Sequence, residues 1–156
     1  MPTTPERWIV TGANRGIGLG LVRTLIERGR EVVATARKPD EAADLHATGA
    51  RVEQLDAADD ASVRAFADRL SDLAIDALIN NAGVFPAAGR GLDDLDPGDW
   101  TRAMVTNALG PVLVARALAP RMEDSARRLM LNISSQMGSI DRALAGGATG
   151  NYHYRA

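Results

Sequence analysis

The chain has 156 residues, 46% of them hydrophobic and 24% charged, which is the size and composition of one compact globular domain. A net charge of −2 without a basic cluster argues against a nucleic-acid-binding or membrane-surface protein. The absence of cysteine excludes disulfides, thiolate metal ligands and a cysteine nucleophile, and the two histidines, His46 and His153, are too far apart in sequence to suggest a metal site.

The N-terminus lacks the basic and then apolar layout of a signal peptide. The longest apolar stretches are broken well short of a membrane span, as by Arg116 within residues 111–120. We therefore expect a cytoplasmic protein.

Short β-branched runs alternate along the chain with longer stretches of helical periodicity. Strands are predicted at residues 8–11, 31–36, 51–55, 77–80 and 129–134. Helices are predicted at residues 16–29, 40–48, 60–73 and 97–122, the last broken near residues 109–111, and residues 138–151 are predicted to form an irregular glycine-rich loop. Alternating strands and helices indicate an α/β fold, a doubly wound parallel sheet of about five strands in a single domain over residues 1–156.

Three glycines lie in the turn between the first strand and the first helix. Gly12 permits a tight turn, Gly16 lets the backbone approach a pyrophosphate, and Gly18 lets helix and strand pack closely. The helix start then offers free N–H groups to the phosphates. The spacing differs from G-x-G-x-x-G, and no Lys-Ser/Thr pair follows, so a P-loop is excluded. A plain strand-to-helix turn, the alternative, needs only one or two glycines.

Residues 11–18 (TGANRGIG) resemble the TGxxxGxG signature of short-chain dehydrogenases/reductases, and residues 80–83 (NNAG) resemble a second motif of that family. Asp56, Asn107 and the pair Ser134-Ser135 follow in the same order as in the family. The resemblance implies a Rossmann-type fold, a carbonyl-reductase-like oxidoreductase and an adenine contact for Asp56. The cofactor-binding residues that follow from the motifs are Gly12, Asn14, Arg15, Gly16, Ile17, Gly18, Arg37, Asp56, Asn80, Ala82 and Gly83.

The end of the second strand bears on the choice of cofactor. An NAD(H) site has a carboxylate there to bind the ribose 2′-hydroxyl, but this strand ends in Arg37 and Lys38, and Glu31 lies at its start. Arg37 and Arg15 can instead bind a 2′-phosphate through charge-assisted hydrogen bonds. We therefore predict NADP(H) rather than NAD(H). The alternative is that Arg37 is a solvated loop residue.

The resemblance implies a catalytic tyrosine, a serine, an asparagine, and a lysine four residues after the tyrosine. Ser135 is preferred to Ser134 as the group that contacts the substrate oxygen. Asn107 would hold a proton-relaying water on its backbone carbonyl. Tyr154 is preferred to Tyr152 as the acid/base, because alanine follows Tyr152 at the lysine position. Structural alternatives are a capped strand end for the serines, a helix break for Asn107 and a frayed terminus for Tyr154.

For Tyr154 the lysine would fall two residues beyond the end of the chain, so we expect a C-terminally incomplete, nearly inactive chain from an active parent. The last strand would then present an apolar edge. The leading function is hydride transfer between the nicotinamide and a small carbonyl or alcohol substrate, and homo-oligomerisation is left open. A truncated, catalytically silent NADP-binding module is the alternative. An epimerase or dehydratase is disfavoured by the glycine spacing and by the lack of an acidic residue after the second strand.

Overall fold

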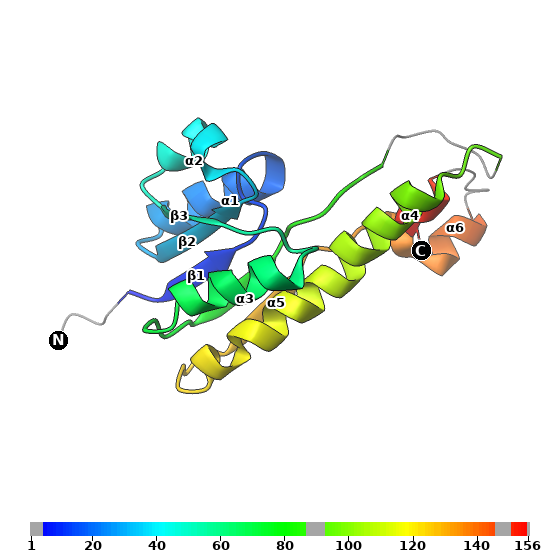
Figure 1. Cartoon of the computed structure of the whole chain (residues 1–156). Coiled ribbons are helices and arrows are strands. Elements are labelled where there is room, and N and C mark those ends of the chain that lie inside the picture. The colour runs from blue at the N-terminus through cyan, green and yellow to red at the C-terminus, as the bar shows by residue number, and fades with distance from the viewer. Residues whose placement is uncertain (1–4, 87–92, 146–150, 156) are drawn as a thin grey trace.

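The computed structural model describes residues 5–86, 93–145 and 151–155, and its centre is a five-stranded parallel sheet (Figure 1). The strands are β1 (Arg7–Val10), β2 (Glu31–Ala36), β3 (Arg51–Gln54), β4 (Ala77–Asn80) and β5 (Leu129–Asn132). Their order in the sheet is β3-β2-β1-β4-β5, and every neighbouring pair is parallel. The chain winds outward from β1 to β3 and then returns to β4, which confirms the doubly wound fold.

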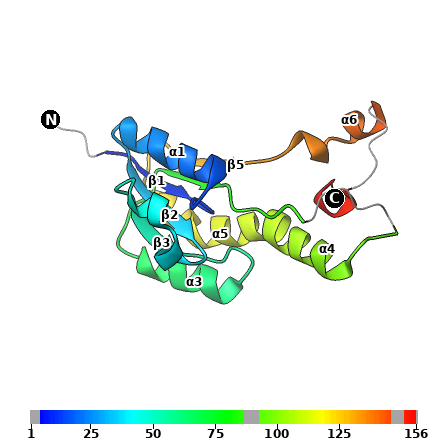
Figure 2. The ribbon, with the colours of Figure 1, turned by 90° about the horizontal axis from the view of Figure 1, so that it is seen from above.

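The helices lie on both faces of this sheet, with α1 on one face and α3 and α5 on the other (Figure 2). In chain order the helical segments are α1 (Gly16–Glu27), η1 (Pro39–Glu41), α2 (Ala43–His46), α3 (Asp60–Arg69), α4 (Pro97–Met104), η2 (Val105–Leu109), α5 (Gly110–Leu118), η3 (Ala119–Met122), η4 (Gln136–Gly138), α6 (Ile140–Ala145) and α7 (Tyr152–Arg155). The segments α4, η2, α5 and η3 together form one long helix, Pro97–Met122. The short α7 packs against α4, at the N-terminal end of this long helix.

Alternation along the strands builds the two cores. Ile9 of β1 faces the α3 and α5 side and Val10 faces the α1 side, and both are fully buried. The helix α1 covers its face with Leu19, Val22 and Leu25. On the other face α3 and α5 pack with residues that include Val63, Phe66, Leu113, Val114 and Leu118. A sheet buried on both sides explains why its central strands read as continuous apolar runs.

The segment Pro97–Met122 is long and apolar enough, by length and composition alone, to cross a membrane. Leu113, Val114 and Leu118 of this segment are buried against the sheet and α3, whereas Leu109 and Val112 are exposed. The break predicted near residues 109–111 lies slightly earlier, at the π-helical η2, and Gly110 then brings the helix close to the loop after β3. A Cβ on Gly110 would lie 2.9 Å from the carbonyl oxygen of Ala57.

The prediction of an irregular loop over residues 138–151 was wrong in its first half. Residues Ile140–Ala145 form α6, because the leucine and two alanines among these six residues favour a helix. Residues 146–150 lie outside the described residues. The helix predicted at 40–48 is likewise divided into η1 and α2.

The strand β5 forms one edge of the sheet, and its side chains are much less buried than those of β1, β2 and β4. Met130 is 39% exposed, Leu131 41% and Ile133 45%. Since these residues alternate between the two faces, apolar surface is exposed on both sides of this edge.

An ion-pair network ties β3 to α3. The carboxylate of Glu53 lies 2.7 Å from both Arg51 and Arg69. Burial raises the pKa of Glu53, but hydrogen bonds from Arg69 and Arg51 outweigh this effect and hold the pKa below its ordinary value of 4.5. A lowered carboxyl pKa stabilises the fold above pH 4.5, and that stability is lost as the pH falls through the folded-state pKa.

We expect Glu53→Gln to lower the free energy of unfolding by about 1 kcal/mol at pH 7, because the ion pairs with Arg51 and Arg69 lose their negative partner. The difference from the wild type should shrink as the pH falls through the lowered folded-state pKa of Glu53, where the carboxylate becomes protonated. Urea unfolding between pH 3 and pH 7 measures this, with exposed Glu27→Gln as the control. A difference that stays constant across the range would contradict a role for the charge.

Candidate cofactor cleft and active-site residues

The glycine-rich turn after β1 has the backbone that its glycines predict. Gly12 and Gly16 both have positive φ, +62° and +56°, a region that other residues rarely adopt. A Cβ on Gly12 would lie 2.7 Å from the Cα of Ala82, so the turn packs closely on the segment after β4. A Cβ on Gly18 would lie 2.6 Å from the carbonyl oxygen of Gly12, whereas Gly16 faces open space. The turn is therefore packed on one side and open to the cleft on the other.

The start of α1 differs from the starts of α3 and α4. Asp59 caps α3 by accepting a hydrogen bond from the N–H of Ala61 at 3.0 Å, and Asp96 caps α4 through the N–H of Asp99 at 2.8 Å. Arg15 stands at the corresponding position of α1 and forms no capping side-chain bond, and no acidic residue lies in the first turn. The first N–H groups of α1 thus remain available to an anion.

The buried Thr11 connects this turn to β4. Its hydroxyl oxygen accepts hydrogen bonds from the N–H groups of Asn81 and Ala82, both at 3.0 Å. The Asn81 side chain donates in return to the carbonyl oxygens of Thr11, at 3.0 Å, and Gly12, at 2.9 Å. On the other side, the N–H of Gly12 donates to the hydroxyl of buried Thr35 in β2 at 3.3 Å. These bonds hold the turn rigidly between two strands.

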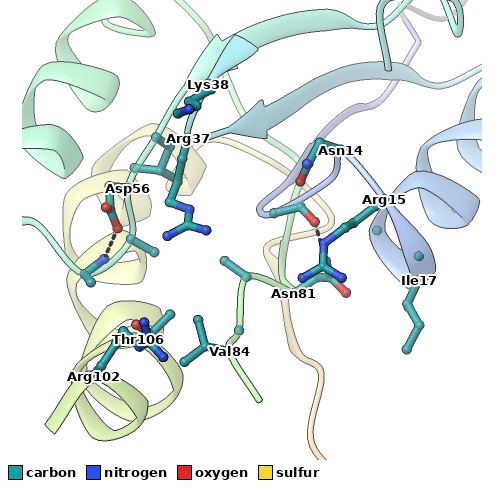
Figure 3. A pocket seen from close by; sticks show the side chains of 18 of the residues that line it. Asn14, Arg15, Ile17, Arg37, Lys38, Asp56, Asn81, Val84, Arg102 and Thr106 are labelled. Carbon is teal, nitrogen blue, oxygen red and sulfur yellow. Dashed lines mark hydrogen bonds between the residues drawn. The ribbon is translucent and has the colours of Figure 1, made fainter. Parts of the chain in front are cut away.

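A cleft of about 630 Å³ opens above the turn, within the range of roughly 300–1,000 Å³ that is usual for cofactor sites (Figure 3). Its walls contain all but one of the predicted cofactor-binding residues: Gly12, Asn14, Arg15, Gly16, Ile17, Gly18, Arg37, Asp56, Ala82 and Gly83. The cleft lies at the carboxyl ends of the strands, beside the point where the winding of the sheet reverses, which is where ligands bind in open α/β sheets.

Asn80, the exception, lies outside this cleft. Its buried side chain donates to the side-chain oxygen of Asn132 at 2.9 Å and lines a second cavity, of about 650 Å³, between β5 and α5. Asn81, the next residue, lines the cleft instead. The two asparagines lie on opposite sides because successive side chains at a strand end alternate in direction.

Arg15 and Arg37 reach toward the cleft from the glycine-rich turn and from the end of β2 (Figure 3). Among the described residues, neither guanidinium forms an ion pair, although nearby Lys38 pairs with Glu41 at 2.8 Å. Two exposed cations without described counter-ions, in the cleft that also contains the start of α1, form a site suited to phosphate.

Asp56 follows β3 and lies on the same side of the cleft as Arg37, across from Arg15 (Figure 3). Its carboxylate accepts a hydrogen bond from the N–H of Ala58 at 3.0 Å, and its own N–H donates to Ser62 at 2.9 Å. Its carboxylate therefore has a defined direction at the rim of the cleft.

Several cleft residues were missed from the sequence, namely Lys38, Glu41, Leu55, Ala57, Ala58, Asn81, Val84, Arg102 and Thr106. Asn81 could have been found, because it belongs to the quoted NNAG motif. Arg102 and Thr106 could not, since they come from the long helix and only its tertiary packing brings them to this cleft (Figure 3).

Asn107 lies at the centre of the π-helical η2. Its side chain accepts from the N–H of Val84 at 2.8 Å and donates to the carbonyl of Val84 at 2.9 Å. The helix irregularity and this paired bond fasten the long helix to the segment after β4. A π-helical turn in a long helix often marks a functional position.

The three predicted catalytic residues are not gathered in one cavity. Ser135 follows β5 and accepts a hydrogen bond from the N–H of Met137 at 3.2 Å. Tyr154, in α7, packs edge-to-face on Phe85 with 4.5 Å between the ring centres. Asn107 lines the second cavity together with Ser134, while Ser135 and Tyr154 line neither cavity.

The parallel sheet with this winding order, its glycine-rich turn and the cleft at the strand ends together define a dinucleotide-binding α/β protein. The sequence matches the family model of short chain dehydrogenases over residues 6–147. The chain therefore belongs to the short-chain dehydrogenase family.

Individual relatives agree with this membership. An uncharacterised oxidoreductase of Schizosaccharomyces pombe is 32% identical over 148 residues, which are 90% of this chain and 58% of the relative. The solved NADPH-bound carbonyl reductase from chicken fatty liver is 30% identical with a TM-score of 0.85, over 98% of this chain and 68% of that one. A carbonyl reductase from Pseudomonas aeruginosa PAO1 is 31% identical with a TM-score of 0.81, over 96% of this chain and 69% of that one.

Proposed function

We propose that this chain is the coenzyme-binding part of an NADP(H)-dependent oxidoreductase that transfers hydride between the nicotinamide and a carbonyl or alcohol substrate. The observation that carries the proposal is a cleft that contains the uncapped start of α1 together with Arg15 and Arg37, neither of which forms an ion pair with a described residue. The NADPH in the similar chicken carbonyl reductase supports the same choice of coenzyme.

The residues present fit such a coenzyme. The diphosphate would accept hydrogen bonds from the first N–H groups of α1, which Gly16 leaves open to the cleft. Arg15 and Arg37 would bind the 2′-phosphate, and Asp56 would accept a hydrogen bond from the adenine. Ala82 and Gly83, with Asn81, form the floor against which the dinucleotide would lie. Asn80, which lies outside the cleft, would support this floor through its bond to Asn132.

When bound, the coenzyme supplies or accepts the hydride. The chain's own residues would handle the proton and orient the substrate. The Tyr154 hydroxyl would give a proton to the substrate oxygen during reduction, and Ser135 would donate a hydrogen bond to that oxygen. The backbone carbonyl of Asn107 would hold the water of a proton relay. These three roles follow from the family resemblance.

A catalytically silent NADP(H)-binding module is the second candidate. The position of Tyr154 on Phe85 and the place of Ser135 outside both cavities favour it. The chain spans only 58% of the S. pombe relative.

A coenzyme titration followed by a turnover assay separates the candidates. We expect the fluorescence of NADPH to rise on binding to the 156-residue chain, with much weaker binding of NADH. Turnover of a simple aldehyde by this chain would exclude the silent module, and binding without turnover would favour it. Failure to bind either coenzyme at millimolar concentration would refute both.

A further inference from the structure

The cofactor cleft contains the carboxylate of Glu41, which lies five residues after the end of β2. Pro39 starts the 3-10 turn η1 directly after Lys38. This turn brings Glu41 into the wall of the cleft, which Arg37 and Lys38 also line. The carboxylate of Glu41 lies 2.8 Å from the ammonium of Lys38, and both side chains are largely exposed. Of the two adjacent cations that follow β2, Lys38 is thus engaged in an ion pair, whereas Arg37 forms none with a described residue.

A phosphate entering this part of the cleft meets opposing effects from Lys38 and Glu41. It attracts the ammonium of Lys38, but the ion pair with Glu41 must loosen before Lys38 can turn to it. The Glu41 carboxylate itself only accepts hydrogen bonds and repels a phosphate dianion. A ribose 2′-hydroxyl, by contrast, can donate to a carboxylate, so Glu41 opposes a 2′-phosphorylated ribose much more than a plain one.

We propose that Glu41 is a specificity-determining residue, which weakens the preference of the cleft for a 2′-phosphorylated nucleotide by holding Lys38 in an ion pair. The proposal rests on the proposed function, since it concerns the same cleft. It makes the choice of coenzyme a balance, in which Arg15 and Arg37 favour the phosphate and Glu41 opposes it. Because the pair is exposed, its effect is modest, about threefold in a dissociation constant.

Two nucleotide fragments test this by isothermal titration of the whole chain. The probe 2′,5′-ADP carries the 2′-phosphate and 5′-AMP lacks it, so the ratio of their dissociation constants measures discrimination. Glu41→Gln keeps the shape of the side chain and removes its charge, and we expect it to raise the preference for 2′,5′-ADP about threefold. The gain should shrink at 1 M salt, where exposed charges are screened.

Two further variants separate the mechanism from a general charge effect. Asp40→Asn removes a neighbouring exposed carboxylate on the same turn that does not line the cleft, and it should leave the ratio unchanged. In a Lys38→Met background, Glu41→Gln should lose at least half of its effect, because the ion pair that it breaks is already absent. Thermal melting of each variant confirms that these exposed substitutions preserve the fold.

The outcomes divide clearly. An unchanged ratio in Glu41→Gln, an equal rise in Asp40→Asn, or a full rise in the Lys38→Met background would overturn the proposal. If the wild-type chain bound 2′,5′-ADP no more tightly than 5′-AMP, the proposed NADP(H) preference itself would fail. The wild-type ratio of dissociation constants tests the NADP(H) preference, whereas the change of this ratio in the variants tests the role of Glu41, so the two failures can be distinguished.

Discussion

Gly12→Ala is expected to abolish measurable NADPH binding and to lower the free energy of unfolding by about 2 kcal/mol. The added Cβ would lie 2.7 Å from the Cα and 3.1 Å from the N of Ala82, which are backbone atoms that no rotamer change can move away. Gly12 also has φ +62°, so alanine would be strained even without this contact. The turn would therefore separate from the segment after β4 and lose the shape that holds a diphosphate.

A matched control lies eight residues further on. Gly20 is exposed within α1, and a Cβ there would meet nothing within 4 Å. Gly20→Ala should raise the free energy of unfolding by about 0.5–1 kcal/mol and leave NADPH affinity unchanged. Urea unfolding and NADPH fluorescence titration measure both quantities. NADPH binding within threefold of wild type in Gly12→Ala would contradict the proposed phosphate site.

The order of strands and helices was predictable because it depends on local patterns. Buried parallel strands read as apolar runs, and Gly12, Gly16 and Gly18 occupy backbone positions where side chains are strained or crowded. Each of these patterns lies in the same few residues whose structure it predicts. The prediction of the glycine-rich turn could therefore be made without knowledge of the tertiary structure.

The missed residues share the opposite property. Whether Asn80 or Asn81 lines the cleft depends on which residue ends β4, and a shift of one residue reverses the side. Glu41 reaches the cleft only because η1 turns the chain back after β2. Arg102 belongs to α4, about sixty residues after Glu41 in the chain, and only tertiary packing brings it to the wall of the cleft.

The relative positions of the three predicted catalytic residues were the least predictable part for a related reason. Ser135, Tyr154 and Asn107 come from three separate parts of the chain, and the distances between them depend on tertiary packing such as that of α7 on α4. Sequence motifs specify the order of such residues and carry no information about distances between them. The contact of Tyr154 with Phe85 could not be predicted from sequence motifs, because Phe85 belongs to the segment after β4 and lies far in the chain from α7.

The double variant Arg15→Gln, Arg37→Gln is expected to weaken NADPH binding about a hundredfold and to change NADH binding by less than about threefold. Each arginine can form charge-assisted hydrogen bonds to a 2′-phosphate, and loss of one such contact typically costs about tenfold in affinity. Neither guanidinium forms an ion pair with described residues, so removing the charges leaves no buried partner unsatisfied, and the fold should be unaffected.

Fluorescence titrations with both coenzymes measure the effect, and Arg23→Gln is the control because Arg23 is exposed on α1 and does not line the cleft. The two single variants should each lose about tenfold for NADPH if both arginines contact the phosphate. Equal loss of NADH and NADPH affinity would mean that the arginines bind the diphosphate common to both coenzymes. In that case the cleft would hold a dinucleotide without selecting for the 2′-phosphate, and the preference for NADP(H) would have to come from elsewhere.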